Sequence, residues 1–207
     1  MVFFKSDEEK KLIKIIKNND IEKVKVIFEN ANNNEVKLNL NIKNKKGFYP
    51  LLWACKNDNI EIIQLLINYA NKYDIKLKIN EKDENGNYPF LWACNNNNIE
   101  IVQLLFNYAN KNNILLKLNE RNKKGNYPIE LACFNNNIKI ARLLINYARN
   151  YIFMELNEKT ENKSYPFLWA CERNNIEMIK LLFEYANDND IILELNETDE
   201  NGNYPLL

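Results

Sequence analysis

The sequence predicts a mainly α-helical solenoid of stacked helix pairs, joined by hairpin-like and extended loops. Three observations predict it. One phrase of residues recurs about every 39 positions, which is typical of repeat architectures. Each copy contains two helix-like segments, and each ends in a short stretch where apolar and polar residues alternate. A single copy cannot bury its apolar residues, so we expect the copies to stack and share one core.

The 5 prolines mark the repeat. They lie 39, 39, 38 and 39 residues apart, within the phrases "GFYPLLWAC", "GNYPFLWAC", "GNYPIELAC", "KSYPFLWAC" and a final "GNYPLL". All 4 cysteines keep the same register, at Cys55, Cys94, Cys133 and Cys171. A second ladder consists of Tyr69, Tyr108, Tyr147 and Tyr185.

Each copy begins with a turn and a short helix. Proline suits the first helical position, where its missing N–H costs no hydrogen bond. In the first full copy the helix is predicted from about Pro50 to Lys56. Asn or Asp then ends the helix in each copy, because these residues tolerate the left-handed conformation. The helix-ending residues are Asp58, Asn97, Asn136 and Asn174.

A longer second helix follows, as in "NIEIIQLLINYA" at 59–70. Its polar positions form one narrow stripe, so the helix must be covered on several sides. The stripe consists of Glu61, Gln64 and Asn68, then Glu100, Gln103 and Asn107, then Lys139, Arg142 and Asn146, then Glu177, Lys180 and Glu184.

After the second helix the period changes to two, which predicts a short extended segment with one buried face. Its apolar positions are Val36, Leu38 and Leu40; Ile75, Leu77 and Ile79; Ile114, Leu116 and Leu118; Ile152, Met154 and Leu156; Ile191, Leu193 and Leu195.

The opening copy, residues 7–34, lacks the Tyr-Pro phrase and carries extra lysines on its first helix, as the polar end of a stack requires. The other end has no such copy. We expect either a fragment of a longer array or a poorly held segment over residues 196–207. The predicted division of one array, 1–207, is a cap at 1–40, repeats at 41–79, 80–118, 119–156 and 157–195, and a truncated fifth repeat at 196–207.

The phrase G-x-Y-P-x-L-x-A-C, followed by N-x-I-E-I-I-x-L-L, resembles the ankyrin repeat over essentially the whole chain. The copy is longer than the usual 33 residues, and the extra residues lie in the alternating segment. The family's Thr before Pro is Tyr here, which removes a capping hydroxyl normally worth about 1 kcal/mol. The family's His is replaced by Leu52, Leu91, Leu168 and Leu207, with Glu130 in the third copy. We therefore expect an apolar Tyr–Leu contact in place of a hydrogen bond. Lys163 replaces the hairpin Gly of the other copies, so that turn is expected to be strained or differently shaped.

Composition argues against an enzyme. The chain has no His, which removes the commonest general base and most zinc ligand sets. The cysteines lie one repeat apart, too far for a disulfide, and each behaves as a small buried residue. We expect no catalytic residue, no cofactor and no metal.

The balance of 28 Lys+Arg and 28 Asp+Glu disfavours a general nucleic-acid binder. No apolar run reaches the ~20 residues of a membrane span, and the first residues do not form a signal peptide. An intracellular, cytoplasmic monomer without nucleic-acid or membrane partners is expected.

The ankyrin resemblance implies that hairpin tips and first-helix ends line a concave face that grips a protein partner. The tips at 43–46, 82–85, 121–124, 159–162 and 198–201 carry formal charges of +3, −1, +3, 0 and −2. The groove is thus expected to be of mixed charge, more basic toward its N-terminal half, with Glu130 and Phe134 exposed. Trp53, Trp92 and Trp169 either pack between helices or anchor the partner.

The predicted partner-binding residues are Lys43, Lys45, Lys46, Phe48, Trp53, Lys56, Lys82, Glu84, Trp92, Asn95, Arg121, Lys123, Lys124, Glu130, Phe134, Lys159, Glu161, Trp169, Glu172 and Arg173. The leading hypothesis is a non-enzymatic interaction scaffold that meets, in part, acidic groups of a protein partner. The alternatives are the repeat portion of a larger enzyme or channel, or an array without a defined partner. The resemblance also implies possible hydroxylation of Asn41, Asn80, Asn119 and Asn157.

Overall fold

The structure is a computed structural model that describes residues 5–205. The chain divides into two compact units, unit 1 (residues 1–116) and unit 2 (residues 117–207). The described residues contain ten helices and no strand, so the predicted mainly α-helical solenoid is confirmed. None of the helices in the described range is long and apolar enough to cross a membrane.

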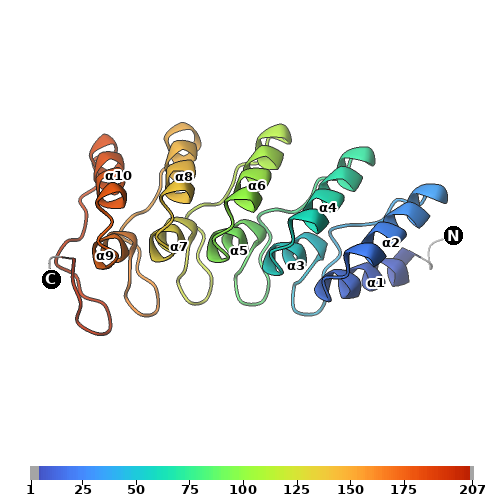
Figure 1. Ribbon diagram of the computed structural model, residues 1–207, viewed down its shortest axis with the longest axis horizontal. Helices are drawn as coiled ribbons and strands as arrows, with labels where there is room; N and C mark the ends of the chain where they lie inside the picture. Colours follow the sequence, from blue (N-terminus) through green and yellow to red (C-terminus); the bar gives the residue numbers. More distant parts are fainter. Residues whose placement is uncertain (1–4, 206–207) are drawn as a thin grey trace. The chain divides into compact units, whose positions relative to one another are not determined.

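Unit 1 consists of three helix pairs (Figure 1). These are α1 (Lys5–Lys17) with α2 (Ile21–Asn33), α3 (Pro50–Lys56) with α4 (Ile60–Lys72), and α5 (Pro89–Asn95) with α6 (Ile99–Lys111). The first helices of successive pairs pack on one another, α1 on α3 and α3 on α5. The second helices form another layer, α2 on α4 and α4 on α6.

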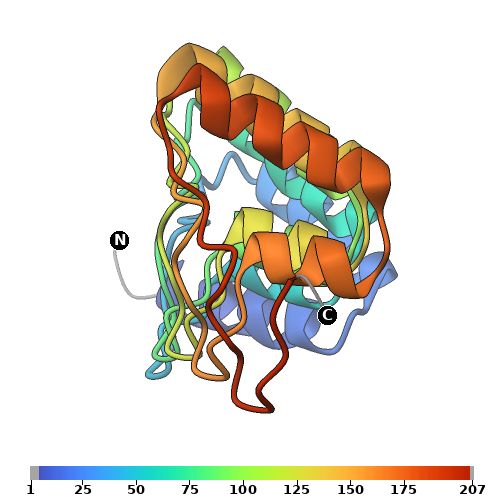
Figure 2. The same cartoon turned by 90° about the vertical axis from the view of Figure 1, so that its left-hand side faces the viewer.

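Unit 2 contains two pairs, α7 (Pro128–Phe134) with α8 (Ile138–Tyr151) and α9 (Pro166–Glu172) with α10 (Ile176–Asp188). Here α7 packs on α9 and α8 on α10. Figure 2 shows the last pair from its end, with the segment after α10 descending on one side to a hairpin-like turn. The boundaries proposed for the cap and the individual repeats stay a prediction.

The short first helices are built as the sequence predicts. Proline occupies the first turn of α3, α5, α7 and α9, and the preceding Tyr makes no side-chain cap. The residues after these helices take positive φ angles, 56° at Asp58, 59° at Asn97, 55° at Asn136 and 50° at Asn174. The predicted left-handed helix ends are therefore confirmed.

The runs of Asn do more than turn the chain. In the run at 96–98, Asn96 donates from Nδ2 to the Cys55 carbonyl at 2.9 Å, one repeat earlier. Asn97 takes the left-handed conformation, and Asn98 caps α6 by accepting from the Glu100 and Ile101 amides. Three adjacent Asn residues thus bind the previous repeat, end one helix and begin the next.

The extended segments after the second helices bury their apolar residues without forming a sheet. Leu38, Leu77 and Met154 are at most 2% exposed. The predicted alternation is confirmed for these positions, whereas the first residue of each segment is only half-buried. No strand ladder joins the segments in the described part of the chain, so side chains must satisfy their backbone groups.

Two ladders of tyrosines supply some of these hydrogen bonds. The Tyr49 hydroxyl donates to the carbonyls of Lys78 (2.6 Å) and Glu81 (2.9 Å) in the following repeat. Tyr69 reaches the other way, donating to the Val36 carbonyl at 2.7 Å. The Tyr49 ring is fully buried and its hydroxyl is hydrogen-bonded, whereas the expected apolar Tyr–Leu contact stays a prediction.

Lys163 adopts φ 59°, near the 79–81° of the four glycines at the same turn position. Its amide donates to the Thr160 carbonyl at 2.9 Å, as the Gly47 amide does to Asn44 at 3.0 Å. The turn therefore keeps its shape, and the lysine carries the cost of a left-handed conformation.

The last hairpin-like turn has the same form, with the Gly202 amide donating to the Asp199 carbonyl at 3.2 Å. Leu207, predicted at the position of the family's His, lies outside the described residues. Whether residues 196–207 are poorly held stays a prediction.

Candidate partner-binding surface

The hairpin tips are shaped by one side chain at the second tip position. Asn44 Oδ1 accepts from the amides of Lys46 (2.9 Å) and Phe48 (3.0 Å), and Asp83, Asn122 and Asp199 do the same in their own tips. These are Asx-type turns, which fix a loop without strand pairing. The sequence signal was present, since Asn or Asp recurs at this position, but it was not recognised.

Within each unit, consecutive tips are joined through their backbones. In unit 1 the Glu84 amide donates to the Lys46 carbonyl at 3.1 Å. In unit 2 the Glu161 amide donates to Lys124 at 2.9 Å and the Glu200 amide to Asn162 at 3.1 Å. The tips of a unit thus form a connected rim.

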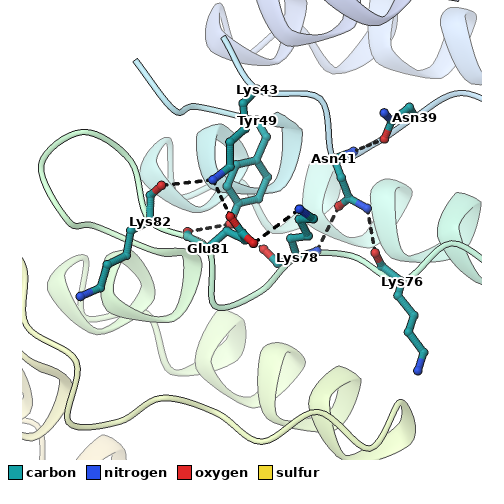
Figure 3. A network of polar contacts seen from close by, with 8 residues as sticks. All are labelled: Asn39, Asn41, Lys43, Tyr49, Lys76, Lys78, Glu81 and Lys82. Carbon is teal, nitrogen blue, oxygen red and sulfur yellow. Dashed lines mark hydrogen bonds and ion pairs between the residues drawn. The ribbon is translucent and has the colours of Figure 1, made fainter. Parts of the chain in front are cut away.

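Several tip cations are already paired inside the molecule. Lys43 Nζ lies 2.6 Å from the Glu81 carboxylate, and this hydrogen bond holds the pKa of Glu81 below its ordinary value (Figure 3). Lys159 contacts Glu197 at 2.8 Å and Glu194 at 3.1 Å in unit 2. Lys46 and Glu84 form a longer ion pair of 3.7 Å. Arg121 and Glu158 form a further ion pair, and both of its side chains are exposed.

Three tip lysines remain available. Lys45 in unit 1 and Lys123 and Lys124 in unit 2 are exposed, and their ammonium groups have no carboxylate partner among the described residues. Exposed ion pairs contribute little to folding stability, so a role in folding does not account for these three lysines. They are free to be solvated or to bind an anion from outside the chain.

In unit 1 the first-helix ends carry an aromatic cluster. Phe48 and Trp53 stack with ring centroids 4.2 Å apart, and Lys56 Nζ lies 4.9 Å and 5.0 Å from these centroids and 5.3 Å from that of Trp92. Phe48 is only 5% exposed, so it supports Trp53 and cannot itself present its ring to a partner. Lys17, which was not predicted, adds a second cation 5.7 Å from the Trp53 ring.

In unit 2 the corresponding cluster is formed by Phe134, Trp169 and Arg173. Phe134 is 41% exposed, as predicted, and its ring meets Trp169 edge-to-face at 4.9 Å. The Arg173 guanidinium lies 5.6 Å from the Phe134 centroid and 6.0 Å from that of Trp169. This combination of apolar ring and cation is suited to binding another protein.

Glu130 is not exposed, and that prediction is wrong. The side chain is 3% exposed because it replaces a core leucine of the other repeats, and its Oε1 accepts from Trp169 Nε1 at 2.9 Å. Burial raises the pKa of Glu130 to about 7, against the opposing effect of the Trp169 hydrogen bond. Its role is to orient Trp169 from beneath the surface.

The three tryptophans were predicted either to pack between helices or to be presented to a partner. Each is half-buried, so each is partly packed and partly accessible. Trp169 has its hydrogen bond to Glu130, whereas the indole N–H groups of Trp53 and Trp92 are buried without a partner in the described structure.

The other candidates lie at or near the surface. The exposed ones are Lys43, Lys45, Lys46, Lys56, Glu84, Asn95, Arg121, Lys123, Lys124, Phe134, Glu161, Glu172 and Arg173, and Lys82 and Lys159 are half-buried. In unit 1, Phe48, which follows the tip at 43–46, contacts Trp53 and Lys56 of α3. That the tips and the first-helix ends form one binding surface stays a prediction.

Three of the four cysteines lie in the core. Cys55, Cys94 and Cys133 are buried, and burial raises the pKa of each thiol. No group of three or more potential metal ligands occurs within residues that the structure describes. The predicted hydroxylation of Asn residues stays a prediction.

A comparison with protein-family models finds the model described as "Ankyrin repeats (3 copies)", which matches residues 12–114, 75–154 and 111–194. The matches together span most of the chain. A search of curated proteins finds no match.

Proposed function

Because the chain belongs to the ankyrin-repeat family, we propose that it is a non-enzymatic scaffold that binds a protein partner through its hairpin tips and first-helix ends. Ankyrin repeats are generally protein-interaction modules, which supports the general role. The finer proposal rests on Lys45, Lys123 and Lys124, the tip cations left without carboxylate partners. The partner surface therefore carries acidic groups.

The aromatic clusters support the same assignment. Partner binding concentrates on a few aromatic and Arg side chains near the centre of an interface. Trp53 with Lys56 in unit 1, and Phe134 with Arg173 in unit 2, place such groups at the first-helix ends. The lysines would meet acidic groups, and the aromatic side chains would contribute buried area.

Charge reversal tests the proposal. Lys45, Lys123 and Lys124 are changed to Glu, and the full chain is used to capture proteins from the cells that express it. A matched control reverses Lys111, Lys139 and Lys180, three exposed lysines outside the tips, with the same change in net charge. We expect a specific partner to be retained by the control and lost, or weakened at least tenfold, with the tip variant. Equal loss or equal retention by both variants contradicts the tip assignment.

A further inference from the structure

Unit 1 contains a shallow pocket of about 410 Å³ that has no residue in common with the proposed partner-binding surface. It is lined by Glu9, Lys37, Leu38, Asn39, Asp74 and Ile75. Its volume falls within the ~300–1,000 Å³ range of small-ligand sites. The feature that needs explaining is Glu9, a carboxylate on α1 that is only 7% exposed.

Interior repeats show what normally occupies this position. Asn41 donates from Nδ2 to the Lys76 carbonyl at 2.8 Å and accepts from the Lys78 amide at 3.0 Å (Figure 3). In unit 2, Asn119 does the same with Phe153 and Glu155, and Asn157 with Ile192 and Glu194. One carboxamide thus satisfies a carbonyl and an amide of the next extended segment.

In the first helix pair Glu9 takes the place of that carboxamide. Its Oε1 accepts from the Asn39 amide at 2.7 Å, as Asn41 accepts from Lys78 one repeat later. An ionised carboxylate cannot donate, so the matching carbonyl, that of Lys37, receives no donor from it. Among the described residues neither this carbonyl nor the second oxygen of Glu9 has a hydrogen-bond partner.

The pocket is therefore rich in acceptors, and Lys37 supplies the only cationic side chain among its lining residues. The Asp74 carboxylate adds a third acceptor group, and Leu38 and Ile75 contribute apolar lining. Glu9 and Asp74 against Lys37 leave one negative charge, which a single cation balances. A guanidinium carries five N–H donors in a rigid plane and no acceptor, so it can bond to a carboxylate and a carbonyl together.

We propose that this pocket binds a guanidinium group, carried by an arginine side chain of a protein or by a small guanidino compound. The pocket shares no residue with the partner-binding surface. The guanidinium proposal and the partner-binding proposal can therefore be tested independently.

The test uses the full chain labelled with ¹⁵N and three probes. N-acetyl-argininamide represents an arginine side chain, agmatine represents a free guanidino compound, and N-acetyl-citrullinamide is a near-isosteric neutral control. We expect saturable shifts of the Leu38, Asn39 and Ile75 amide signals with one or both guanidinium probes, and none with the citrulline probe. A preference for the first or second probe identifies the source of the ligand. Absence of binding by both, or equal binding of the neutral control, overturns the proposal.

Glu9→Gln sharpens the test because Gln reproduces the interior arrangement. Its Oε1 can still accept from the Asn39 amide, while its Nε2 can donate to the Lys37 carbonyl. The acceptors proposed for the guanidinium are then no longer available. We expect guanidinium binding to weaken at least tenfold, with the unfolding midpoint unchanged or raised. Glu29→Gln, the same change at an exposed position of α2, serves as control and should leave binding unchanged. Full binding by Glu9→Gln also overturns the proposal.

Discussion

Glu130 shows how one residue changes the role of its neighbour. The repeat before Trp92 has leucine at this position, Leu52, and the indole N–H of Trp92 has no partner among the described residues. In unit 2 the Glu130 carboxyl accepts a hydrogen bond from Trp169 Nε1. The cost is the burial of an ionisable group whose other oxygen has no partner among the described residues. The residue therefore positions a surface aromatic group through a buried hydrogen bond.

The raised pKa makes this contribution depend on pH. The pKa of Glu130 rises from its ordinary 4.5 to about 7, so its stabilising effect is complete below about pH 4.5 and is lost as pH rises through 7. Glu130→Gln keeps an acceptor for Trp169 and cannot ionise. Relative to the wild type, we expect the free energy of unfolding of this variant to gain up to about 3 kcal/mol between pH 4.5 and pH 8.

Urea unfolding of both proteins at several pH values measures this difference. Glu184→Gln on α10, the same change at an exposed carboxyl, is the matched control. A difference for Glu130→Gln that does not change with pH would show that the Glu130 carboxyl is solvated in the folded chain.

The turn at Lys163 offers a second residue-level prediction. Glycine takes a positive φ without the steric cost that a side chain incurs, so Lys163→Gly should raise the free energy of unfolding by about 0.5–1 kcal/mol. Chemical denaturation measures the gain.

Gly125 and Gly202 occupy the same turn position in other repeats and test the opposite change, from glycine to alanine. A Cβ at Gly125 would lie 2.7 Å from the Thr160 Cα, whereas a Cβ at Gly202 meets nothing within 4 Å. Gly125→Ala should therefore destabilise unit 2 more than Gly202→Ala, which carries only the conformational cost. Similar losses at both sites would mean that the contact between adjacent tips relaxes freely.

At the scale of elements, the extended segments are held by side chains in place of a strand ladder. Asn41, Asn119 and Asn157 each join two backbone groups of the next segment, and the tyrosine hydroxyls bind others. This helps to explain how the repeat accommodates its extra residues: several of the added backbone groups are hydrogen-bonded to a repeated Asn or Tyr side chain.

Removing one of these Asn side chains should lower the free energy of unfolding. Asn41→Ala leaves the Lys76 carbonyl and the Lys78 amide without their partner. Because both groups lie near the surface, we expect a loss of about 0.5–1.5 kcal/mol in the free energy of unfolding. Asn71→Ala, at an exposed position of α4, is the control and should be neutral or slightly stabilising, because Ala favours helix. If both variants unfold alike, water replaces the clamp at no cost.

At the scale of the whole molecule, the same residue type occurs in different environments along the chain. Cys55, Cys94 and Cys133 are buried, but Cys171 in the last helix pair is half-buried. With a thiol reagent under native conditions we expect Cys171 to react first, and the other three to react slowly and together with unfolding. A Cys171→Ser variant should lose the fast phase; four equally fast thiols would contradict the described core.

The sequence by itself determined the mainly α-helical repeat, because its recurring residues act on the local backbone. Pro begins α3, α5, α7 and α9, and Asn or Asp ends each of these helices. It also determined that central positions of the extended segments, such as Leu38, Leu77 and Met154, are buried, since alternation needs only one covered face. It did not determine that the first apolar residue of each segment is half-buried. It did not determine that Glu130 and Phe48 are buried, that Asn41 and its equivalents bind the next segment, or that Glu9 replaces them in the first pair. Those outcomes depend on which groups stacking brings together across about 30–40 residues of chain, and no local pattern encodes that distance in space.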